Sequence, residues 1–261
     1  MRRNRMLPTG VLIVLVVIAA ALCITLGVLM YMDKKGAAGE EAREEPVQTE
    51  DISGEDGEDG SLIPKDKEIN VKELKDSVNK DICAWLYIPD TGIDTPVLRS
   101  EEDLMFYSDH NEKGEADENG AIYMQMINSA DFSDNLTVLY GHNSEAGSGF
   151  SALGSFGDPE FFDSHPYIYI YTPEEVLVYE VFAAYESDDK LLVIFYGTSN
   201  DDQYSVYLSR IEDQIGLGGN LRKEALPDPG YKTLTLSTGI KGRDDRRFLV
   251  QGRLYGAFAL P

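Results

Sequence analysis

The residue best suited to proton transfer in this 261-residue sequence is His142, one of three histidines. It lies in Leu139–Asn143 (LYGHN), where an apolar run ends and a loop rich in glycine and serine begins. An imidazole titrates near neutral pH, and catalytic side chains often lie on loops that a rigid strand positions. The same pattern is typical of a surface histidine in a turn, so the residues alone leave both interpretations open. His110 and His165 lie in turn-like polar segments, where we expect structural or solvent-facing roles.

A second segment with chemical potential is Thr233–Ile240 (TLTLSTGI), a β-type run that leads into small residues. A polar loop follows at 241–246, and then a second β-type run from Arg247 to Leu254. This pattern predicts a β-hairpin with a small-residue turn and with Arg247 at its base. On local grounds Arg247 forms a surface ion pair, and Gly239 is a turn residue that tolerates positive φ.

These segments, in this order, resemble the class B sortases, which are cell-wall transpeptidases of the bacterial surface. The histidine motif of that family, YGHN, is intact at Tyr140–Asn143, and its TLSTC motif is present as TLSTG at Thr235–Gly239. The family's arginine, which opens the last strand, matches Arg247 in RRFLVQGRL. Further similar stretches follow in the family's order from about residue 70 to the end: Ala84–Pro89, Ile93–Val97, Gly120–Tyr123 and His165–Tyr171.

The resemblance implies a reaction and a role for each matching residue. In the family a cysteine thiol attacks a backbone carbonyl in the C-terminal sorting signal of a secreted protein. A histidine protonates the leaving amine, and an arginine stabilises the oxyanion. By resemblance His142 is the acid/base and Arg247 the oxyanion residue, while Asn143, Ser237 and Thr238 contact substrate. An amine of a peptidoglycan precursor or of a pilin then resolves the acyl-enzyme, and neither a metal nor another cofactor is needed.

Gly239 stands where the family has its nucleophilic cysteine, and glycine cannot form a thioester. Thr238 should face away from residue 239, because consecutive strand residues point to opposite faces. Ser237 shares the face of residue 239 but is displaced by about 6–7 Å along the strand. Three hypotheses follow: a pseudo-sortase that binds sorting signals without cleaving them, a sortase inactivated at one position or using another nucleophile, and a scaffolding surface domain.

The elements that must position these residues are mostly short strands. Runs rich in Val, Ile, Tyr and Phe predict strands separated by turn signals, at 84–88, 121–124, 137–140, 167–171, 176–185, 232–236 and 247–254. Helical spacing of apolar residues predicts helices over Val71–Lys80 and Gln203–Ile215. Many short strands with few helices indicate a closed or nearly closed β-barrel. The resemblance makes this a closed, eight-stranded sortase-like barrel with a few peripheral helices.

The N-terminal part predicts a membrane anchor followed by a spacer. Residues 11–32 are almost continuously apolar and uncharged, which is the length of one bilayer-spanning helix. Arginines in the preceding residues 1–10 favour a cytoplasmic N-terminus, and no small-residue cleavage site suggests a removed signal peptide. Residues 33–64 are an acidic linker with little to bury. We therefore expect a single-pass membrane protein whose domain, residues 65–261, is extracellular on a Gram-positive-type surface.

Charge and cysteine content exclude other classes. The formal net charge of −23 argues against nucleic-acid binding, which needs a basic surface. Cys23 lies in the expected membrane segment and Cys83 in an apolar run, so no disulfide framework is expected. The sequence has no cluster of cysteine and histidine ligands of the kind that binds zinc.

Overall fold

The computed structural model describes residues 62–65, 67–144, 147–189, 192, 201–215, 218–228 and 230–260. The chain divides into the units Met1–Glu58 and Asp59–Pro261, and every described residue belongs to the second. The expected anchor at 11–32, and all but the last residues of the expected linker, lie outside the described residues. None of the described helices is long and apolar enough to cross a membrane.

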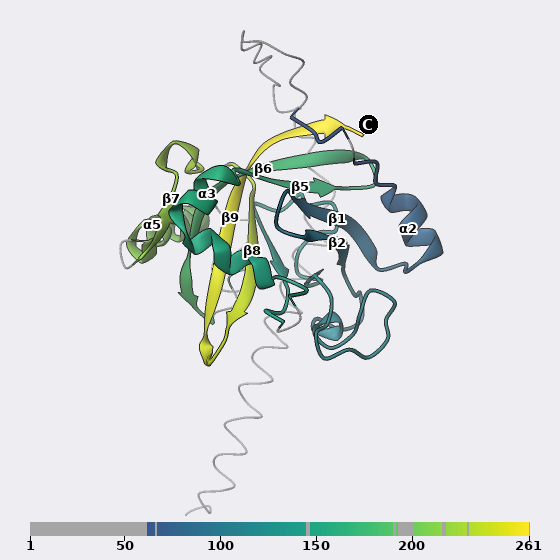
Figure 1. The fold of residues 1–261 in the computed structure, drawn as a ribbon. Helices are drawn as coiled ribbons and strands as arrows, with labels where there is room; N and C mark the ends of the chain where they lie inside the picture. The colour runs from purple at the N-terminus through teal and green to yellow at the C-terminus, as the bar shows by residue number, and fades with distance from the viewer. Residues whose placement is uncertain are drawn as a thin grey trace, which may run out of the picture. The chain divides into compact units, whose positions relative to one another are not determined.

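The described residues form a mostly β fold with a few helices (Figure 1). The helices are α2 (Val71–Ser77), α3 (Pro159–Ser164) and α5 (Asp201–Ile215), with short 3-10 turns at Phe106–Ser108, Ser151–Gly157 and Lys223–Ala225. The strands are β1 (Ile82–Ile88), β2 (Ile93–Leu98), β3 (Tyr123–Met124), β4 (Leu136–Tyr140), β5 (Tyr167–Tyr171), β6 (Glu175–Asp188), β7 (Gly219–Leu221), β8 (Thr233–Ile240) and β9 (Arg243–Ala259).

Eight of these strands close into a barrel, as expected from the sequence. The sheet order is β5-β1-β2-β3-β4-β8-β9-β6-β7, and an additional β5–β6 pairing joins the two ends of the eight-strand series. β7 lies outside that ring and pairs only with β6 among the described strands. Closure leaves β4, β8 and β9 side by side, since β8 pairs in parallel with β4 and antiparallel with β9.

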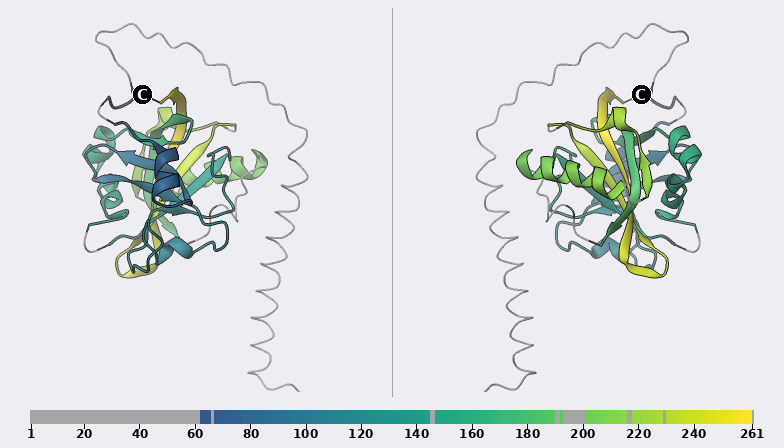
Figure 2. Two further views of the ribbon diagram at one scale, coloured as in Figure 1. Left: turned by 90° about the vertical axis from the view of Figure 1, so that its right-hand side faces the viewer. Right: turned by 90° about the vertical axis from the view of Figure 1, so that its left-hand side faces the viewer.

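Period-two alternation explains why these segments form strands with two buried faces. In β5 (YIYIY), Ile168 and Ile170 belong to one apolar cluster. Tyr167, Tyr169 and Tyr171 pack in the second apolar cluster, on the other face. Because side chains alternate across a strand, both faces need cover. The first cluster contains residues of the 151–157 turn and α3, and the second contains residues of α2 and α5. Figure 2 shows α3 and α5 on opposite sides of the barrel.

The two expected helices are present with shifted ends. The helix α2 begins after Asn70, whose side-chain oxygen accepts a hydrogen bond from the Glu73 backbone N–H at 3.1 Å. It ends at Ser77 rather than at the expected Lys80. The Asn79 side chain donates instead to the Tyr107 hydroxyl and the Glu112 carbonyl, which are far away in sequence. The helix α5 covers the expected 203–215 and begins two residues earlier.

The strand β2 was not among the strands expected from periodicity, because Pro96 interrupts its pattern. Proline has no backbone N–H, so it cannot donate the hydrogen bond that a strand between two neighbours normally makes at that position. In β2, Pro96 lies opposite Trp85 of β1, whereas the pairing with β3 involves only Leu98 and Tyr123. Among the described strands, most of β2 therefore pairs on one side only. The missing N–H of Pro96 removes no hydrogen bond between β2 and β3.

The last hairpin differs from the expected one in the place of its turn. β8 does not end in a small-residue turn at 237–239 but continues to Ile240, paired with β4 as far as Ser237 and with β9 along its whole length. The turn lies at Lys241 and Gly242, where Gly242 has φ +73°. Gly239 pairs with Arg247 whereas Ile240 pairs with Arg243, so 244–246 have no partner on β8. This bulge re-aims the side chains at the tip of the hairpin.

Candidate functional site

One pocket of about 470 Å³ lies where β4 and β8 end and β9 begins. His142 and Asn143, just beyond β4, line it beside Gly239 of β8 and Arg247 of β9. The remaining lining residues come from the end of β4, the hairpin tip and the β2–β3 connection: Tyr140, Gly141, Ile240, Lys241, Gly242, Arg243, Asp244, Arg246, Met105, Ser108 and Tyr123. The structure therefore brings together His142, Gly239 and Arg247, which are far apart in sequence.

The main chain of His142 is held while its side chain remains exposed. Its carbonyl accepts a hydrogen bond from the Phe150 N–H at 2.8 Å, and Asn143 forms a β-bridge with Gly149. A Cβ at Gly149 would lie 2.6 Å from the His142 carbonyl oxygen, so only glycine permits this approach. The loop thus fixes the backbone from which an exposed imidazole projects at the pocket.

Gly141, directly before His142, has no room for a side chain. A Cβ there would lie 2.8 Å from Cδ2 of Phe150 and closer still to Cδ1 of Ile122, both of which are buried. Its carbonyl accepts a 2.8 Å hydrogen bond from the Thr238 hydroxyl, and its N–H donates to the Ser237 carbonyl. Glycine at 141 therefore allows the end of β4 to lie close against both β8 and the Phe150 ring.

Gly239 shows the opposite situation. It is a strand residue whose φ is not positive, and a Cβ placed on it would meet no atom within 4 Å. Gly239 is therefore not the turn residue that the local pattern indicated, and its backbone makes no use of positive φ. Its carbonyl accepts a hydrogen bond from the Asn143 side-chain amide at 3.3 Å. Neither the backbone nor the packing requires glycine at this position, and the pocket has space for a larger residue.

The two glycines make a matched pair of substitutions. We expect Gly141→Ala to lower the free energy of unfolding by about 1–3 kcal/mol, because Ile122 and Phe150 must move to admit the methyl group. Gly239→Ala should change it by less than about 0.5 kcal/mol, since nothing is displaced. Denaturant unfolding of the two variants beside the parent chain measures both values. Equal losses in the two variants would contradict this description of the pocket wall.

Arg247 is half-buried, and its guanidinium group is held by a hydrogen bond at the Nε edge. Its Nε–H donates to the Asp189 carboxylate at 2.6 Å, which confirms the expected surface ion pair, and Arg247 itself also lines the pocket. Two tyrosines of the pocket wall, Tyr123 and Tyr140, stack with ring centroids 5.6 Å apart. Burial raises the pKa of Tyr123 to about 12, and the positive charge of Arg247 opposes that rise. The part of the wall formed by the two tyrosines is therefore aromatic and uncharged at neutral pH.

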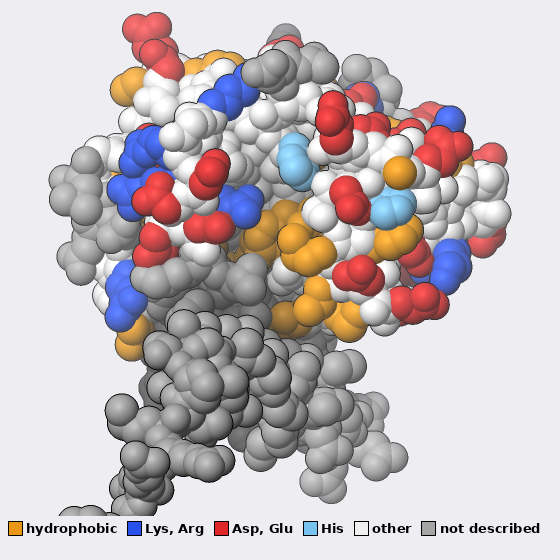
Figure 3. Space-filling view, turned by 90° about the horizontal axis from the view of Figure 1, so that it is seen from below, with side chains coloured by type: hydrophobic (Ala, Val, Ile, Leu, Met, Phe, Trp, Pro, Cys, Tyr) orange, Lys and Arg blue, Asp and Glu red, His pale blue; other side chains and the backbone are white. Residues whose placement is uncertain are grey.

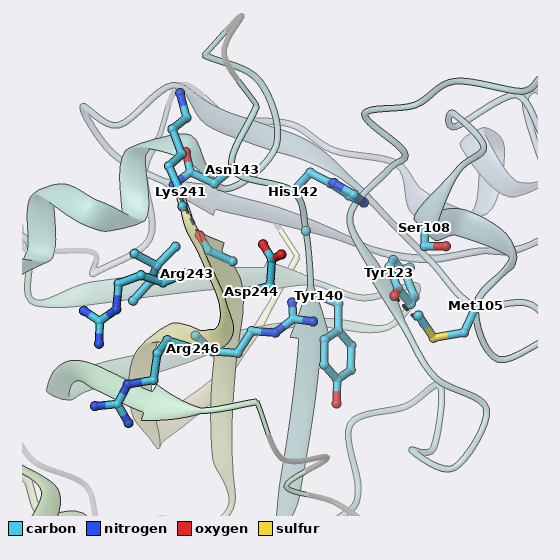
Figure 4. A pocket seen from close by; sticks show the side chains of 15 residues that line it. Met105, Ser108, Tyr123, Tyr140, His142, Asn143, Lys241, Arg243, Asp244 and Arg246 are labelled. Carbon is cyan, nitrogen blue, oxygen red and sulfur yellow. Dashed lines mark hydrogen bonds between the residues drawn. The ribbon is translucent and has the colours of Figure 1, made fainter. Parts of the chain in front are cut away.

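The sticks in Figure 4 show how the labelled side chains lie around the pocket. Arg243 and Arg246 extend away from His142, whereas the Asp244 carboxylate points toward the space between His142 and Tyr140. The wider face around the site carries acidic and basic side chains interspersed around an apolar patch beside a histidine (Figure 3). The site therefore has local charges of both signs instead of one uniform field.

Ser237 and Thr238, expected to contact substrate, are buried at 3% and 1% exposure. Neither is among the described residues that line the pocket, and the Thr238 hydroxyl is occupied by the Gly141 carbonyl. Their substrate-binding role remains a prediction. Asn143 does line the pocket, so of these three residues it is the one directly accessible to a ligand.

The other chemically capable residues lie elsewhere. His110 stacks on Phe106 at 4.0 Å between ring centroids, and His165 stacks on Phe161 at 3.8 Å. Cys83 is buried as expected, and burial raises the pKa of its thiol to about 12. It is not among the residues that line the pocket and cannot replace a nucleophile there. Among the described residues no group of His, Cys, Asp and Glu is arranged to hold a metal ion.

Sequence reasoning missed Asp189, Asp244, Met105 and Tyr123 as parts of this site. Asp189 and Asp244 stand in runs of charged residues that look like solvated surface. Met105 belongs to a segment without such a signal, whereas Tyr123 belongs to the family-like stretch Gly120–Tyr123 but was not assigned to the site. The pairing of β6 with β9 brings Asp189 near Arg247, and the pairing of β3 with β4 brings Tyr123 opposite Tyr140.

The closed barrel and its pocket define a class of protein, the sortases. The sortase domain profile matches residues 86–255, which is more than half of the chain, and the chain belongs to this family. Its relatives are class B sortases. Sortase B of Listeria monocytogenes is 32% identical over 186 residues, covering 70% of this chain and 74% of that protein.

Solved structures of class B sortases have the same fold. Clostridium perfringens sortase B superposes with a TM-score of 0.63 at 27% identity, covering 71% of this chain and 99% of that chain. A substrate complex of Staphylococcus aureus sortase B gives a TM-score of 0.63, covering 73% of this chain and 85% of that chain. At 22% identity this second likeness concerns the fold alone. The expected resemblance to class B sortases is confirmed.

Proposed function

We propose that this domain binds the C-terminal sorting signals of secreted proteins in the pocket between β4, β8 and β9. The observation that carries the proposal is the convergence of His142, Gly239 and Arg247 on that one pocket. Gly239 and Arg247 are direct partners across the hairpin, and the Asn143 amide connects the histidine loop to Gly239. Membership of the sortase family and the similarity to class B sortases support this choice of ligand.

In this proposal each residue has the role that its family position implies. A cysteine at 239 would attack the signal's carbonyl carbon to form a thioester, while the scissile C–N bond breaks. His142 would give the leaving nitrogen its proton, and Arg247 would donate hydrogen bonds to the oxyanion. An amine of a peptidoglycan precursor or a pilin would then displace the thiol and form a new amide. Asn143, Ser237 and Thr238 would contact or shape the bound signal.

Because residue 239 is glycine, we propose that the chain as it stands captures sorting signals without cleaving them. Among the described residues, neither Cys83 nor the two hydroxyl neighbours of residue 239 is placed to replace the thiol. Cys83 is buried away from the pocket, and the Thr238 hydroxyl is hydrogen-bonded to Gly141. Ser237 is buried and, on an extended strand, about 6–7 Å from residue 239. A pocket that holds the acid and the oxyanion group but lacks the nucleophile retains recognition while losing turnover.

We place this domain outside the cell, held at the membrane by the apolar segment 11–32 and separated from it by the acidic residues 33–64. That location would bring the pocket to secreted proteins as they emerge and to amine acceptors of the wall. Protease accessibility of the domain on intact cells, combined with membrane fractionation, tests the placement. Recovery of the full-length chain in the soluble cytoplasmic fraction would refute it.

Binding of sorting-signal peptides by the unmodified chain tests the proposed function. Fluorescence anisotropy with a panel of labelled peptides from C-terminal sorting signals should give saturable binding of at least one, with a Kd of about 1 mM or tighter. The same peptides should remain intact during long incubation. A scrambled peptide of identical composition is the control. If no peptide of the panel binds even at millimolar concentration, the capture function is wrong and a scaffolding role takes its place.

A further inference from the structure

The side chain of Arg247 is constrained by one specific bond. Its Nε–H donates to Oδ1 of Asp189 at 2.6 Å, a short distance typical of a charge-assisted hydrogen bond. Within the described residues, the two Nη groups of Arg247 have no hydrogen-bond partner. The guanidinium is therefore held at its Nε edge, while its two Nη groups remain available at the pocket that Arg247 lines.

Backbone pairing explains why Asp189 lies at this place. β6 pairs antiparallel with β9, so that Ser187 lies opposite Arg247 and Asp188 opposite Arg246. The ladder continues one step beyond the strand, because the Asp189 N–H donates to the Asp245 carbonyl at 3.2 Å. The backbone of Asp189 is thus fixed relative to β9. Its side chain is 46% exposed, and it makes its ion pair from a defined position.

A second pair on the same two strands provides a comparison. Arg243 of β9 donates to Glu186 of β6, also at 2.6 Å, but Arg243 extends away from His142 in Figure 4. Arg247 lies directly opposite Gly239, where substrate would be attacked. The two ion pairs therefore have the same chemistry. Only the Asp189 pair involves the arginine that lies opposite residue 239.

We propose that Asp189 is the positioning residue for Arg247, and that it holds the guanidinium with both Nη groups directed to the carbonyl oxygen of a bound peptide. The inference rests on the proposed function. A free arginine side chain has many rotamers, and binding must otherwise restrict them at an entropic cost. The carboxylate of Asp189 removes that cost before the peptide arrives.

A double-mutant cycle in the full-length chain tests this role, with the tightest-binding peptide of the sorting-signal panel as probe. We expect Arg247→Gln to weaken binding about tenfold, because it removes charged hydrogen-bond donors. Asp189→Ala should weaken it about three- to tenfold, and the double variant no further than Arg247→Gln alone. Asp189→Glu should recover part of the loss. The matched control Glu186→Ala, which breaks the neighbouring pair, should stay within about twofold of the parent.

A direct spectroscopic readout accompanies the cycle. The Arg247 Nε–H resonance, identified as the one absent from Arg247→Gln, should be slow to exchange in the parent and in Glu186→Ala, but fast in Asp189→Ala. Peptide binding that Asp189→Ala and Glu186→Ala weaken equally would overturn the positioning role and leave the proposed function standing. Additive losses in the double variant would overturn it too. Complete lack of peptide binding by the parent would refute the proposed function and this inference together.

Discussion

Gly239→Cys is expected to confer peptide cleavage and amine transfer on a chain that, in our proposal, binds sorting signals without cleaving them. Loss of a catalytic nucleophile costs about four to six orders of magnitude in rate, so restoration should exceed the background by a comparable factor. The substitution is compatible with the fold, because a Cβ at 239 meets no atom within 4 Å and the backbone has no positive φ. A sorting-signal peptide with a quenched fluorophore, with and without an amine acceptor, measures both steps.

Two companion variants make that result interpretable. Gly239→Ala admits a side chain without a nucleophile and should remain inactive. Gly239→Ser supplies a hydroxyl that is far less acidic than a thiol, and it should give at most weak activity. Equal cleavage by the parent chain and by Gly239→Cys would place the nucleophile elsewhere. Silence of Gly239→Cys with a peptide that the parent binds would mean that the pocket captures signals but has lost the remaining catalytic geometry.

In the Gly239→Cys background, removal of His142 or Arg247 should have the next largest effects. We expect His142→Gln to lower kcat by about 10²–10⁴-fold, because the leaving amine then departs without a positioned acid. Arg247→Gln should lower kcat by about 10²–10³-fold through loss of oxyanion stabilisation. Steady-state kinetics of the variants measure both effects. The two losses should not add in full, since both residues act on one intermediate.

Matched controls separate these roles from general damage to the site. His110→Gln and Arg253→Gln remove the same chemical groups from positions that do not line the pocket. His110 stacks on Phe106 and Arg253 pairs with Glu180, so neither change should alter kcat by more than about twofold. A His142→Gln variant with unchanged kcat would remove the acid role from His142. Its pH–rate profile would then show which group carries the proton.

The sequence predicted those parts of the fold that periodicity can express. The alternation in Tyr167–Tyr171 predicted β5 without error, and the spacing of Tyr204, Tyr207 and Ile211 predicted the buried side of α5. The strand β2 was missed because a proline is normally disfavoured inside a sheet. The predicted end of β8 was also wrong. The small residues Ser237–Gly239 are typical of a turn, and no local pattern shows that β8 pairs with β4 and β9.

The site could be predicted only in part. Residue patterns alone left His142 open between a catalytic group and a turn histidine, and the family resemblance supplied the link to Gly239 and Arg247. The contribution of Asp189 depends on strand pairing beyond the end of β6, which no local pattern expresses. The free space at Gly239 depends on atoms from other strands. Tertiary contacts, which a local sequence pattern does not encode, decided both points.

The intact mass of Gly239→Cys after exposure to a sorting-signal peptide shows whether residue 239 is the nucleophile position of a sortase site. We expect an added mass equal to the peptide's acyl part, released by hydroxylamine and mapped to residue 239, with no adduct on the parent chain. An adduct on Cys83 or Ser237, or the same adduct on the parent chain, would show that residue 239 is not that position.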